Sequence, residues 1–243
     1  FYHHALSLRT GKDTMEKEIA DAASDETGVL RLGISPNRGR LVLPEILSAY
    51  TAAYPGIHVE LTEEINRGLM KKLLDGDMDL TIAYFKEEVP GVTRELFYKE
   101  EIVLLIPKSL FPEKGNEKII EEIKSKKEGC LAPLKDFPFL LTGSGTVQGR
   151  LSHRLFAEAD IEPPVLVSSD NLELLLDLCT KGTGAFFCPD VQVTGNVSPE
   201  KLKQLHVIPL AHSKIEISFG YRKELRQWKP LANFISLARK KRH

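Results

Sequence analysis

Large apolar residues recur along the first third of the chain in two periods, one typical of strands and one typical of helices. The pattern predicts a strand at 29–35, a turn at 36–40, a helix at 41–54, a strand at 57–62, a helix at 66–74 and a strand at 79–84. Pro44 falls in the tolerated first turn of its helix, and Asn66 can cap the helix that it begins. The strand–helix–strand–helix–strand order implies a parallel sheet with helices on both faces.

The rest of the chain begins with a different period and then repeats the α/β order. The predicted elements are strands at 96–98 and 101–107, a helix at 117–127, a strand at 139–141, a loop at 142–145, a helix at 146–159, a strand at 165–168, a helix at 171–181, strands at 184–188, 205–210 and 215–221, and a closing helix that ends at 240. Two α/β halves with late return strands predict two lobes joined by two crossings, near 100–107 and 211–217. Residues 1–24 are expected to form a polar, weakly amphipathic helix that serves as a connector or a dimer contact.

Composition narrows the class of protein. The 243 residues carry 33 Lys and Arg against 34 Asp and Glu, a net charge of -1, with 42% apolar residues. These values exclude intrinsic disorder and a disulfide scaffold, and they argue against a surface that binds nucleic acid. Three cysteines without Cys-x-x-Cys spacing favour reduced thiols in a cytosol. No secretory signal or membrane span is apparent, and Phe1 suggests a start inside a longer gene product.

The candidate motifs for catalysis and metal binding each lack required residues. The acidic run 75–79 lacks the Gly and the final Glu of a calcium loop. Residues 142–146 lack the outer glycines of a nucleophile elbow and the Lys of a phosphate loop. Gly182 and Gly184 lack the third Gly of a dinucleotide fingerprint. We therefore expect no enzyme, no cofactor and no metal.

Two polar loops remain, at 35–39 and 142–146, each between a strand and a helix. In open α/β sheets ligands bind at the carboxyl ends of strands, and helix N-termini favour anions. We therefore expect the two loops to form a cleft for a small anionic ligand. The alternative is that their Ser, Asn and Thr residues are only caps and turn formers.

At these residues the chain resembles a known family. The segments that carry the resemblance are GVLRLGISPNRGRLVLPEILSAYTAAYPGIHVEL (28–61), LMKKLLDGDMDLTIAY (69–84), EEIVLLIPKSL (100–110) and LLLDLCTKGTGAFFCP (174–189). They resemble, in order, the effector-binding region of LysR-type transcriptional regulators. The resemblance implies an α/β, two-lobed type 2 periplasmic-binding-protein fold, with two Rossmann-like subdomains joined by two crossing strands. It places the end of a linker helix at 1–27, lobe I at 28–103 and 217–243, and lobe II at 104–216.

The same resemblance implies the site and the partners. The effector-binding positions would be Ser35, Asn37, Arg38, Asn66, Thr142, Gly143, Ser144, Ser169 and Pro189. The family commonly has Ser or Thr where this chain has Asn37 and Asn66. Arg38 would add a bidentate carboxylate partner if it faces inward, with a solvent-facing side chain as the alternative. Asn66 could bind the ligand or only cap its helix.

The resulting hypothesis is the ligand-sensing and dimerising region of a bacterial LysR-type regulator in the cytoplasm. A small anion, such as a carboxylate, would bind between the lobes and bias their closure. DNA would be contacted only through an N-terminal domain outside this sequence, and the protein would be a homodimer or homotetramer, with lobe I against lobe II of the partner. A solute-binding protein of a transport system, which shares the fold, is the alternative, and an enzyme of the same fold is a more distant one.

Overall fold

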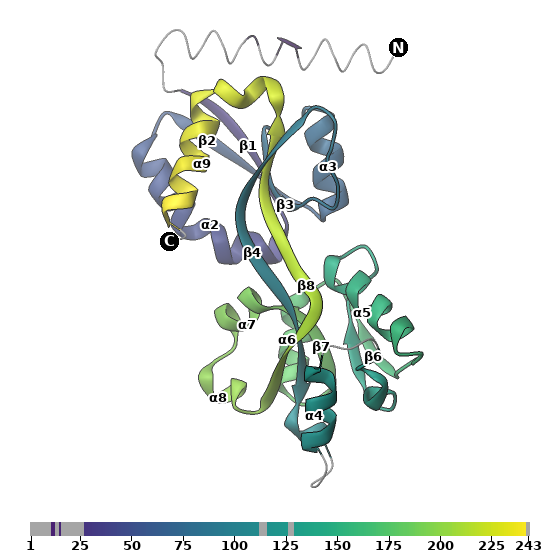
Figure 1. Cartoon of the computed structure of the whole chain (residues 1–243). Coiled ribbons are helices and arrows are strands. Elements are labelled where there is room, and N and C mark those ends of the chain that lie inside the picture. Colours follow the sequence, from purple (N-terminus) through teal and green to yellow (C-terminus); the bar gives the residue numbers. More distant parts are fainter. Residues whose placement is uncertain (1–10, 13–14, 16–26, 112–115, 126–128, 242–243) are drawn as a thin grey trace. The chain divides into compact units, whose positions relative to one another are not determined.

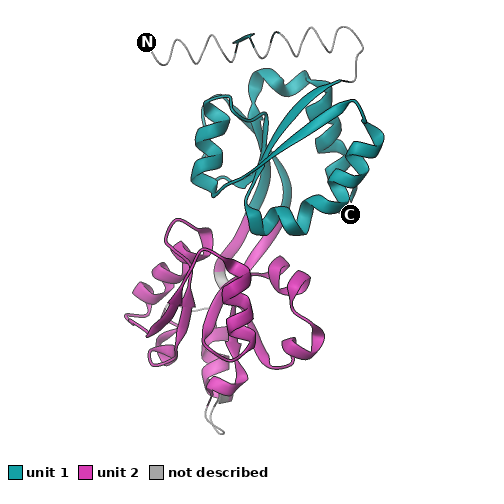
Figure 2. Cartoon of the chain, turned by 180° about the vertical axis from the view of Figure 1, so that it is seen from behind, with its two compact units in different colours: residues 1–98, 216–243 teal, residues 99–215 magenta. Residues whose placement is uncertain are grey.

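The computed structural model describes residues 11–12, 15, 27–111, 116–125 and 129–241. The chain divides into two compact units, unit 1 with residues 1–98 and 216–243 and unit 2 with residues 99–215 (Figure 2). Two long strands, β4 (Val92–Pro107) and β8 (Leu205–Arg222), run through both units. The predicted helix at 1–24 and linker segment at 1–27 lie almost wholly outside the described residues.

Unit 1 is built on the strand order β2-β1-β3-β8-β4. Its other elements are β1 (Gly28–Ile34), α2 (Pro36–Ala53), β2 (Ile57–Glu63), α3 (Asn66–Leu74), β3 (Leu80–Tyr84), the 3-10 helix η3 (Lys223–Gln227) and α9 (Lys229–Lys241). The central strand β1 pairs in parallel with β2 and with β3, and β3 pairs antiparallel with β8. The carboxyl ends of three neighbouring strands therefore meet at one edge of this sheet.

Helices cover both faces of the unit 1 sheet (Figure 1). A Cβ atom on Gly33 would lie 2.3 Å from Met78 Sδ and 2.9 Å from Leu69 Cδ2, so α3 packs closely on this face. The next residue, Ile34, lies 3.0 Å from the place of a Cβ atom on Gly39 of α2. Because successive strand side chains point to opposite faces, α3 and α2 cover opposite faces of β1.

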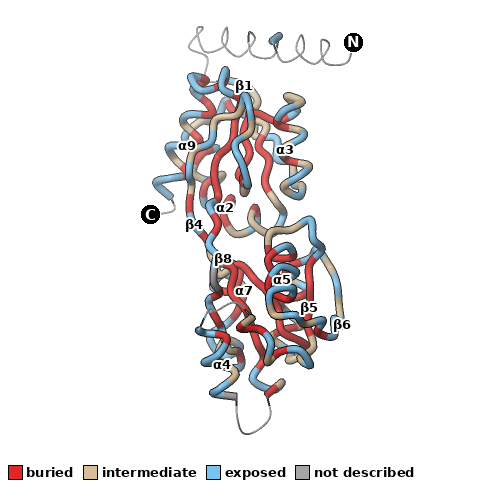
Figure 3. Tube along the Cα trace, turned by 45° about the vertical axis from the view of Figure 1, so that its right-hand side comes forward, coloured by how far each residue is buried: buried red, intermediate tan, exposed pale blue. Residues whose placement is uncertain are grey.

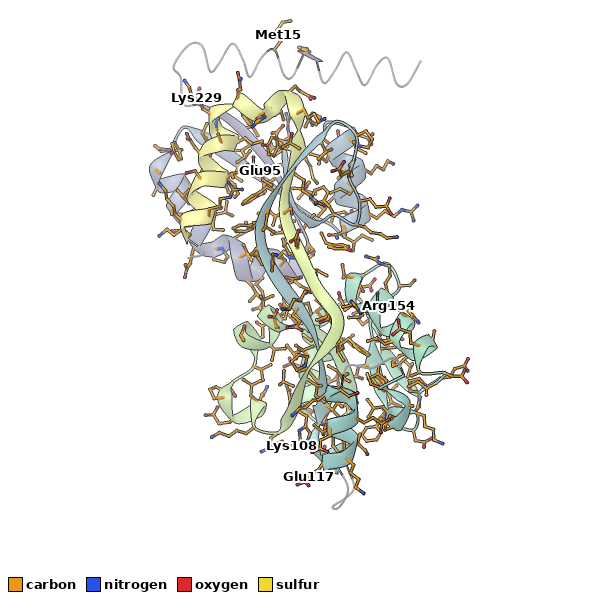
Figure 4. All side chains as sticks on the ribbon, in the orientation of Figure 1. Met15, Glu95, Lys108, Glu117, Arg154 and Lys229 are labelled. Carbon is orange, nitrogen blue, oxygen red and sulfur yellow. The ribbon has the colours of Figure 1, made fainter. Side chains whose placement is uncertain are left out.

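The closing helix α9 is tied to the rest of unit 1 by buried and polar contacts. Tyr50 of α2 donates a hydrogen bond to the carbonyl of Pro230 at 2.8 Å, and its ring packs edge-on against Phe234. Glu95 of β4 accepts hydrogen bonds from Tyr221 of β8 and from Arg239 of α9, the latter at 2.8 Å (Figure 4). Segments far apart in the sequence are thus joined around one core.

Unit 2 has the strand order β8-β4-β7-β5-β6, in which β5 pairs in parallel with β6 and β7, and β7 pairs antiparallel with β4. Its other elements are η1 (Lys108–Leu110), α4 (Asn116–Lys124), η2 (Ala132–Leu134), β5 (Phe139–Leu141), α5 (Val147–Glu158), β6 (Val165–Ser168), α6 (Leu172–Thr180), β7 (Ala185–Pro189), α7 (Asp190–Asn196) and α8 (Pro199–Leu202).

The strands β5 and β7 form the buried centre of unit 2 (Figure 3). On one face, Phe139 and Phe187 pack against Phe156 of α5 with ring centroids 4.9 and 5.7 Å away. On the other face, Leu140 and Phe186 belong to a cluster that includes several side chains of α6. The helices α5 and α6 therefore cover opposite faces, as alternating apolar strands require.

The predicted turn at 36–40 is wrong, because α2 already begins at Pro36. Ser35 occupies the N-cap position, and Pro36 fits the first helical turn because its missing N–H group needs no partner there. Pro44, expected in the first turn, therefore lies inside the helix. It removes the hydrogen bond that the carbonyl of Arg40 would otherwise accept.

The predicted strand pairs 96–98 with 101–107 and 205–210 with 215–221 are also wrong in detail, because β4 and β8 are each one continuous strand. The short helices α7 and α8 were not predicted. Ser198 caps α8 by accepting a hydrogen bond from the Lys201 N–H group, and Pro199 follows it. A Ser followed by Pro is typical of a helix start, so this pair could have predicted α8. None of the helices in the described ranges is long and apolar enough to cross a membrane.

Candidate functional site

In unit 1, the candidate residues lie at the carboxyl ends of β1 and β2. The parallel register pairs Ile34 at the end of β1 with Glu63 at the end of β2, and also with Ile82 of β3. The segments that follow β1 and β2 therefore leave the sheet at the same edge. This is the edge at which open α/β sheets bind ligands.

Ser35 and Arg38 are in direct contact at the start of α2. Arg38 Nη1 donates a hydrogen bond to Ser35 Oγ at 3.1 Å, and Ser35 makes no side-chain bond to the backbone of the helix, although it holds the N-cap position. Ser35, Asn37 and Arg38 are all half-buried. A guanidinium group therefore lies beside the positive end of the helix dipole, an arrangement that suits an anion.

Asn66 does not cap α3, so the cap interpretation is wrong. The N-cap residue is Ile65, and Asn66 Nδ2 instead donates a hydrogen bond to the carbonyl of Tyr84 at 3.0 Å, joining α3 to the end of β3. The carboxylate of Glu64 accepts a hydrogen bond from the Ile65 N–H group at 3.0 Å. Its side chain packs so closely on Gly68 that a Cβ atom there would lie 2.2 Å from Glu64 Cγ. This chain thus places its own carboxylate at the start of α3.

In unit 2, Thr142 and Thr146 form a short hydrogen-bonded chain. Thr146 Oγ1 donates to the carbonyl of Gly143 at 2.9 Å and accepts from the Gly149 N–H group at 3.0 Å. The hydroxyl groups of Thr142 and Thr146 lie 2.7 Å apart, so the proton between them comes from Thr142. Thr142 is 4% exposed. Its hydroxyl therefore supports the cap of α5.

The loop after β5 is also held from two other segments. Asp170 Oδ1 accepts a hydrogen bond from the Gly143 N–H group at 3.0 Å, which links the loops after β5 and β6. Arg150 Nη1 donates to the carbonyls of Ser144 and Gly145 at 3.4 and 2.9 Å. The sequence interpretation missed Arg150 and Asp170, because neither belongs to a motif and both act on backbone atoms.

Ser169 follows β6 and Pro189 ends β7, and these two strands pair with β5 on either side. Ser169 Oγ accepts a hydrogen bond from the Asn171 N–H group at 3.1 Å, and the Ser169 N–H group donates to the carbonyl of Leu141 at 3.1 Å. Pro189 is buried at the end of β7. Asp190, which follows it, accepts hydrogen bonds from backbone N–H groups and was likewise missed.

The nine predicted positions divide between the two units. Ser35, Asn37, Arg38 and Asn66 belong to unit 1, and the other five belong to unit 2. Within unit 1 the structure brings Ser35 and Arg38 into contact, and within unit 2 it joins the loops that hold Gly143 and Ser169 through Asp170.

Burial shifts the pKa of several other titratable groups. Cys179 and Cys188 are free thiols with 0% exposure, and burial raises the pKa of Cys179 to about 12 and that of Cys188 well above its ordinary value. Burial, with help from Lys108 and Lys124, lowers the pKa of His206. Within the described ranges, no group of three or more His, Cys, Asp and Glu side chains could hold a metal ion.

Comparison with known proteins gives one consistent family. Residues 23–242 match the family model described as LysR substrate binding domain. The chain is 25% identical over 199 residues to the uncharacterized HTH-type transcriptional regulator YcgK of Bacillus subtilis, covering 79% of this chain and 61% of that protein. It is 23% identical over 209 residues to the HTH-type transcriptional regulator YofA of Bacillus velezensis, covering 86% and 66%. The chain thus spans less than two thirds of the length of these curated relatives.

Solved structures agree on the fold. The effector-binding domain of BenM with its effector benzoate superposes with a TM-score of 0.65 at 20% identity, covering 87% of this chain and 90% of that one. The reduced OxyR regulatory domain from Pseudomonas aeruginosa superposes with a TM-score of 0.66 at 16% identity, covering 88% and 98%. These matches confirm the predicted fold class, an α/β fold of the type 2 periplasmic-binding-protein kind.

Proposed function

Because the chain belongs to the LysR substrate binding domain family, we propose that it is the effector-sensing region of a bacterial LysR-type transcriptional regulator that responds to a small anion. The effector would be held by Ser35, Asn37, Arg38 and Asn66 from unit 1 and by Thr142, Gly143, Ser144, Ser169 and Pro189 from unit 2. Its binding would bias how the two units close on each other, and thereby the DNA contacts of a separate domain of the full-length protein.

The contact between Arg38 and Ser35 at the start of α2 carries the anionic part of this proposal. A guanidinium group is always charged and presents paired donors that match a carboxylate. Its Nη1 atom already lies 3.1 Å from the Ser35 hydroxyl, so an arriving carboxylate could accept from both side chains. The positive end of the α2 dipole favours the same charge.

A thermal-shift screen with benzoate, glutamate, sulfate and phosphate tests this proposal, followed by calorimetry on any compound that raises the melting temperature. Arg38→Gln should weaken the binding of such a compound by about 10- to 100-fold, because charged hydrogen bonds contribute about 1.5–3 kcal/mol. Arg40→Gln is the matched control, because Arg40 is an exposed arginine on the same helical turn. Unchanged affinity in both Arg38→Gln and Asn37→Ala would remove these residues from the site.

We further propose that the chain self-associates into a homodimer or homotetramer. The strands β2 and β6 end the strand order, and β6 exposes Val165 by 46% and Leu166 by 56%. Exposed apolar edge strands favour pairing with another chain. Light scattering that gave only monomer mass, with no cross-linked dimer, would contradict self-association.

A further inference from the structure

Asp190 lies where three segments of unit 2 meet, namely the end of β7, the start of α7 and the strand β4. The antiparallel register pairs Ile102 with Pro189 and Val103 with Cys188, so Asp190 comes opposite Glu101. Asp190 Oδ1 accepts hydrogen bonds from the Glu101 N–H group at 3.0 Å and from the Val191 N–H group at 2.8 Å. A side-chain carboxylate thus continues the ladder between β4 and β7 beyond the last strand residue.

The side chain of Glu101 extends this connection to β8. Glu101 Oε1 lies 3.1 Å from Ser213 Oγ, and the same Oγ atom lies 2.8 Å from the carbonyl of Leu210. Ser213 is 1% exposed. A hydroxyl group has only one proton, so Ser213 shares it between a bond to β4 and a bond within its own strand.

The backbone of β8 is strained at the neighbouring residue. His212 has a φ angle of +51°, a left-handed conformation that non-glycine residues adopt at a cost of about 1–3 kcal/mol. It lies between Leu210 and Ser213, which the serine hydroxyl joins. The strand therefore contains a turn-like distortion that surrounding contacts must hold in place.

This distortion lies close to the places where the chain passes between the units. The division falls between Tyr98 and Lys99 in β4 and between Ile215 and Glu216 in β8. Glu101 and Ser213 therefore join the two crossing strands a few residues inside unit 2. Asp190 holds the Glu101 N–H group from the junction of β7 and α7.

We propose that Asp190 is a positioning residue that couples the junction of β7 and α7, where the candidate effector residue Pro189 lies, to the two crossing strands. The relay runs from the Asp190 carboxylate to the Glu101 backbone, from the Glu101 carboxylate to Ser213, and from there to the distortion at His212. When the junction of β7 and α7 moves, Glu101 shifts, and the Ser213 hydroxyl donates its proton to the Leu210 carbonyl alone. The link to effector binding rests on the proposed function, whereas the relay itself does not.

Amide hydrogen exchange on the purified chain, without any added ligand, tests the relay. Asp190→Ala should raise exchange at Glu101 and Val191 and also, by about tenfold, over residues 208–216 of β8, because a charged hydrogen bond that positions Glu101 is lost. Asp190→Asn keeps an oxygen acceptor at the same place and should restore exchange to near the wild-type rate. If Asp190 acted only through its two direct hydrogen bonds, exchange would change only at Glu101 and Val191, and the relay would be refuted.

Asp170→Ala is the matched control. Asp170 also accepts a hydrogen bond from a backbone N–H group of another loop, that of Gly143, at 3.0 Å. Among the hydrogen bonds of the described residues, none joins Asp170 to Glu101 or to β8. It should raise exchange around Gly143 and leave residues 208–216 at the wild-type rate.

Ser213→Ala tests the relay from its other end, and it serves if Asp190→Ala fails to fold. Coupling between two sites is reciprocal, so this variant should raise exchange at Glu101 and Val191 several-fold. Wild-type rates at 208–216 in Asp190→Ala, or wild-type rates at Val191 in Ser213→Ala, would overturn the proposal. Since no effector is present, neither result depends on whether Arg38 binds an anion.

Discussion

Asp79 and Arg222 form a buried ion pair beneath the start of β3, and its removal tests our account of the unit 1 core. Asp79 Oδ2 accepts a hydrogen bond from the Arg31 N–H group at 2.9 Å, and its Oδ1 lies 3.9 Å from Arg222 Nη2. Arg222 Nη1 donates to the carbonyls of Leu73 and Met78 at 3.2 and 2.7 Å. The two side chains are 0% and 6% exposed, so neither charge is well solvated.

Asp79→Ala should destabilise the protein by about 3–5 kcal/mol, because it leaves a buried guanidinium without its buried counter-charge. The loss should fall near the lower end of that range, since Arg222 Nε also lies 3.2 Å from the half-exposed carboxylate of Glu224. The melting temperature should then fall by about 6–12 °C, taking about 2–4 °C per kcal/mol for a protein of this size.

Urea denaturation followed by circular dichroism measures this loss. The double variant Asp79→Leu/Arg222→Met should be more stable than the sum of its single variants predicts, by at least about 1 kcal/mol, because both buried charges leave together. Glu87→Ala is the control, since its pair with Lys86 is 3.7 Å long and both side chains are more than three-quarters exposed. A loss below about 1 kcal/mol for Asp79→Ala, or additive single variants, would refute the reasoning.

Three further outcomes follow from unit 2. Gly149→Ala should lower the free energy of unfolding by about 1–3 kcal/mol in urea, because its Cβ atom would lie 2.2 Å from a backbone carbonyl, whereas Gly145→Ala meets nothing within 4 Å and should change little. Thr146→Ala should cost about 1 kcal/mol in the same assay through loss of the α5 cap, and full stability in that variant would contradict the cap. Cys179 and Cys188 should resist alkylation by iodoacetamide at pH 8 until urea unfolds the protein, since burial raises the pKa of Cys179 to about 12; rapid native-state labelling would disprove this.

The fold was largely predictable because most of its strands are short apolar runs that stand between turn signals and helical patterns. The predicted strands at 139–141 and 165–168 match β5 and β6 residue for residue. The turn at 36–40 failed because Pro36 and Gly39 are typical of turns as well as of helix starts. In the structure, Gly39 is a residue of the helix, and its small size suits close packing, since a Cβ atom there would lie 3.0 Å from Ile34. The sequence alone does not show this contact.

The partners of the candidate residues were not predictable, because they are set by contacts between distant segments. Gly143 and Asp170 are 27 residues apart, and Glu101 and Asp190 are 89 apart. Neither aspartate lies in a recognisable motif, and each accepts hydrogen bonds from backbone N–H groups. Local spacing can show that a polar residue follows a strand, but it cannot show which backbone group that residue will reach.

The two units use similar polar residues at their helix starts in different ways, and this difference ranks the candidate positions. In unit 2, Thr146 caps α5 through its side chain, so the alternative of caps and turn formers describes the loop at 142–146 well. In unit 1, the Ser35 side chain makes no hydrogen bond to the backbone of α2 and instead accepts one from the Arg38 side chain. Substitutions in the loop that precedes α5 should therefore lower the free energy of unfolding more than they change effector affinity. Substitutions at Ser35 and Arg38 should change effector affinity with little change in stability, and the reverse pattern would place the anion on unit 2.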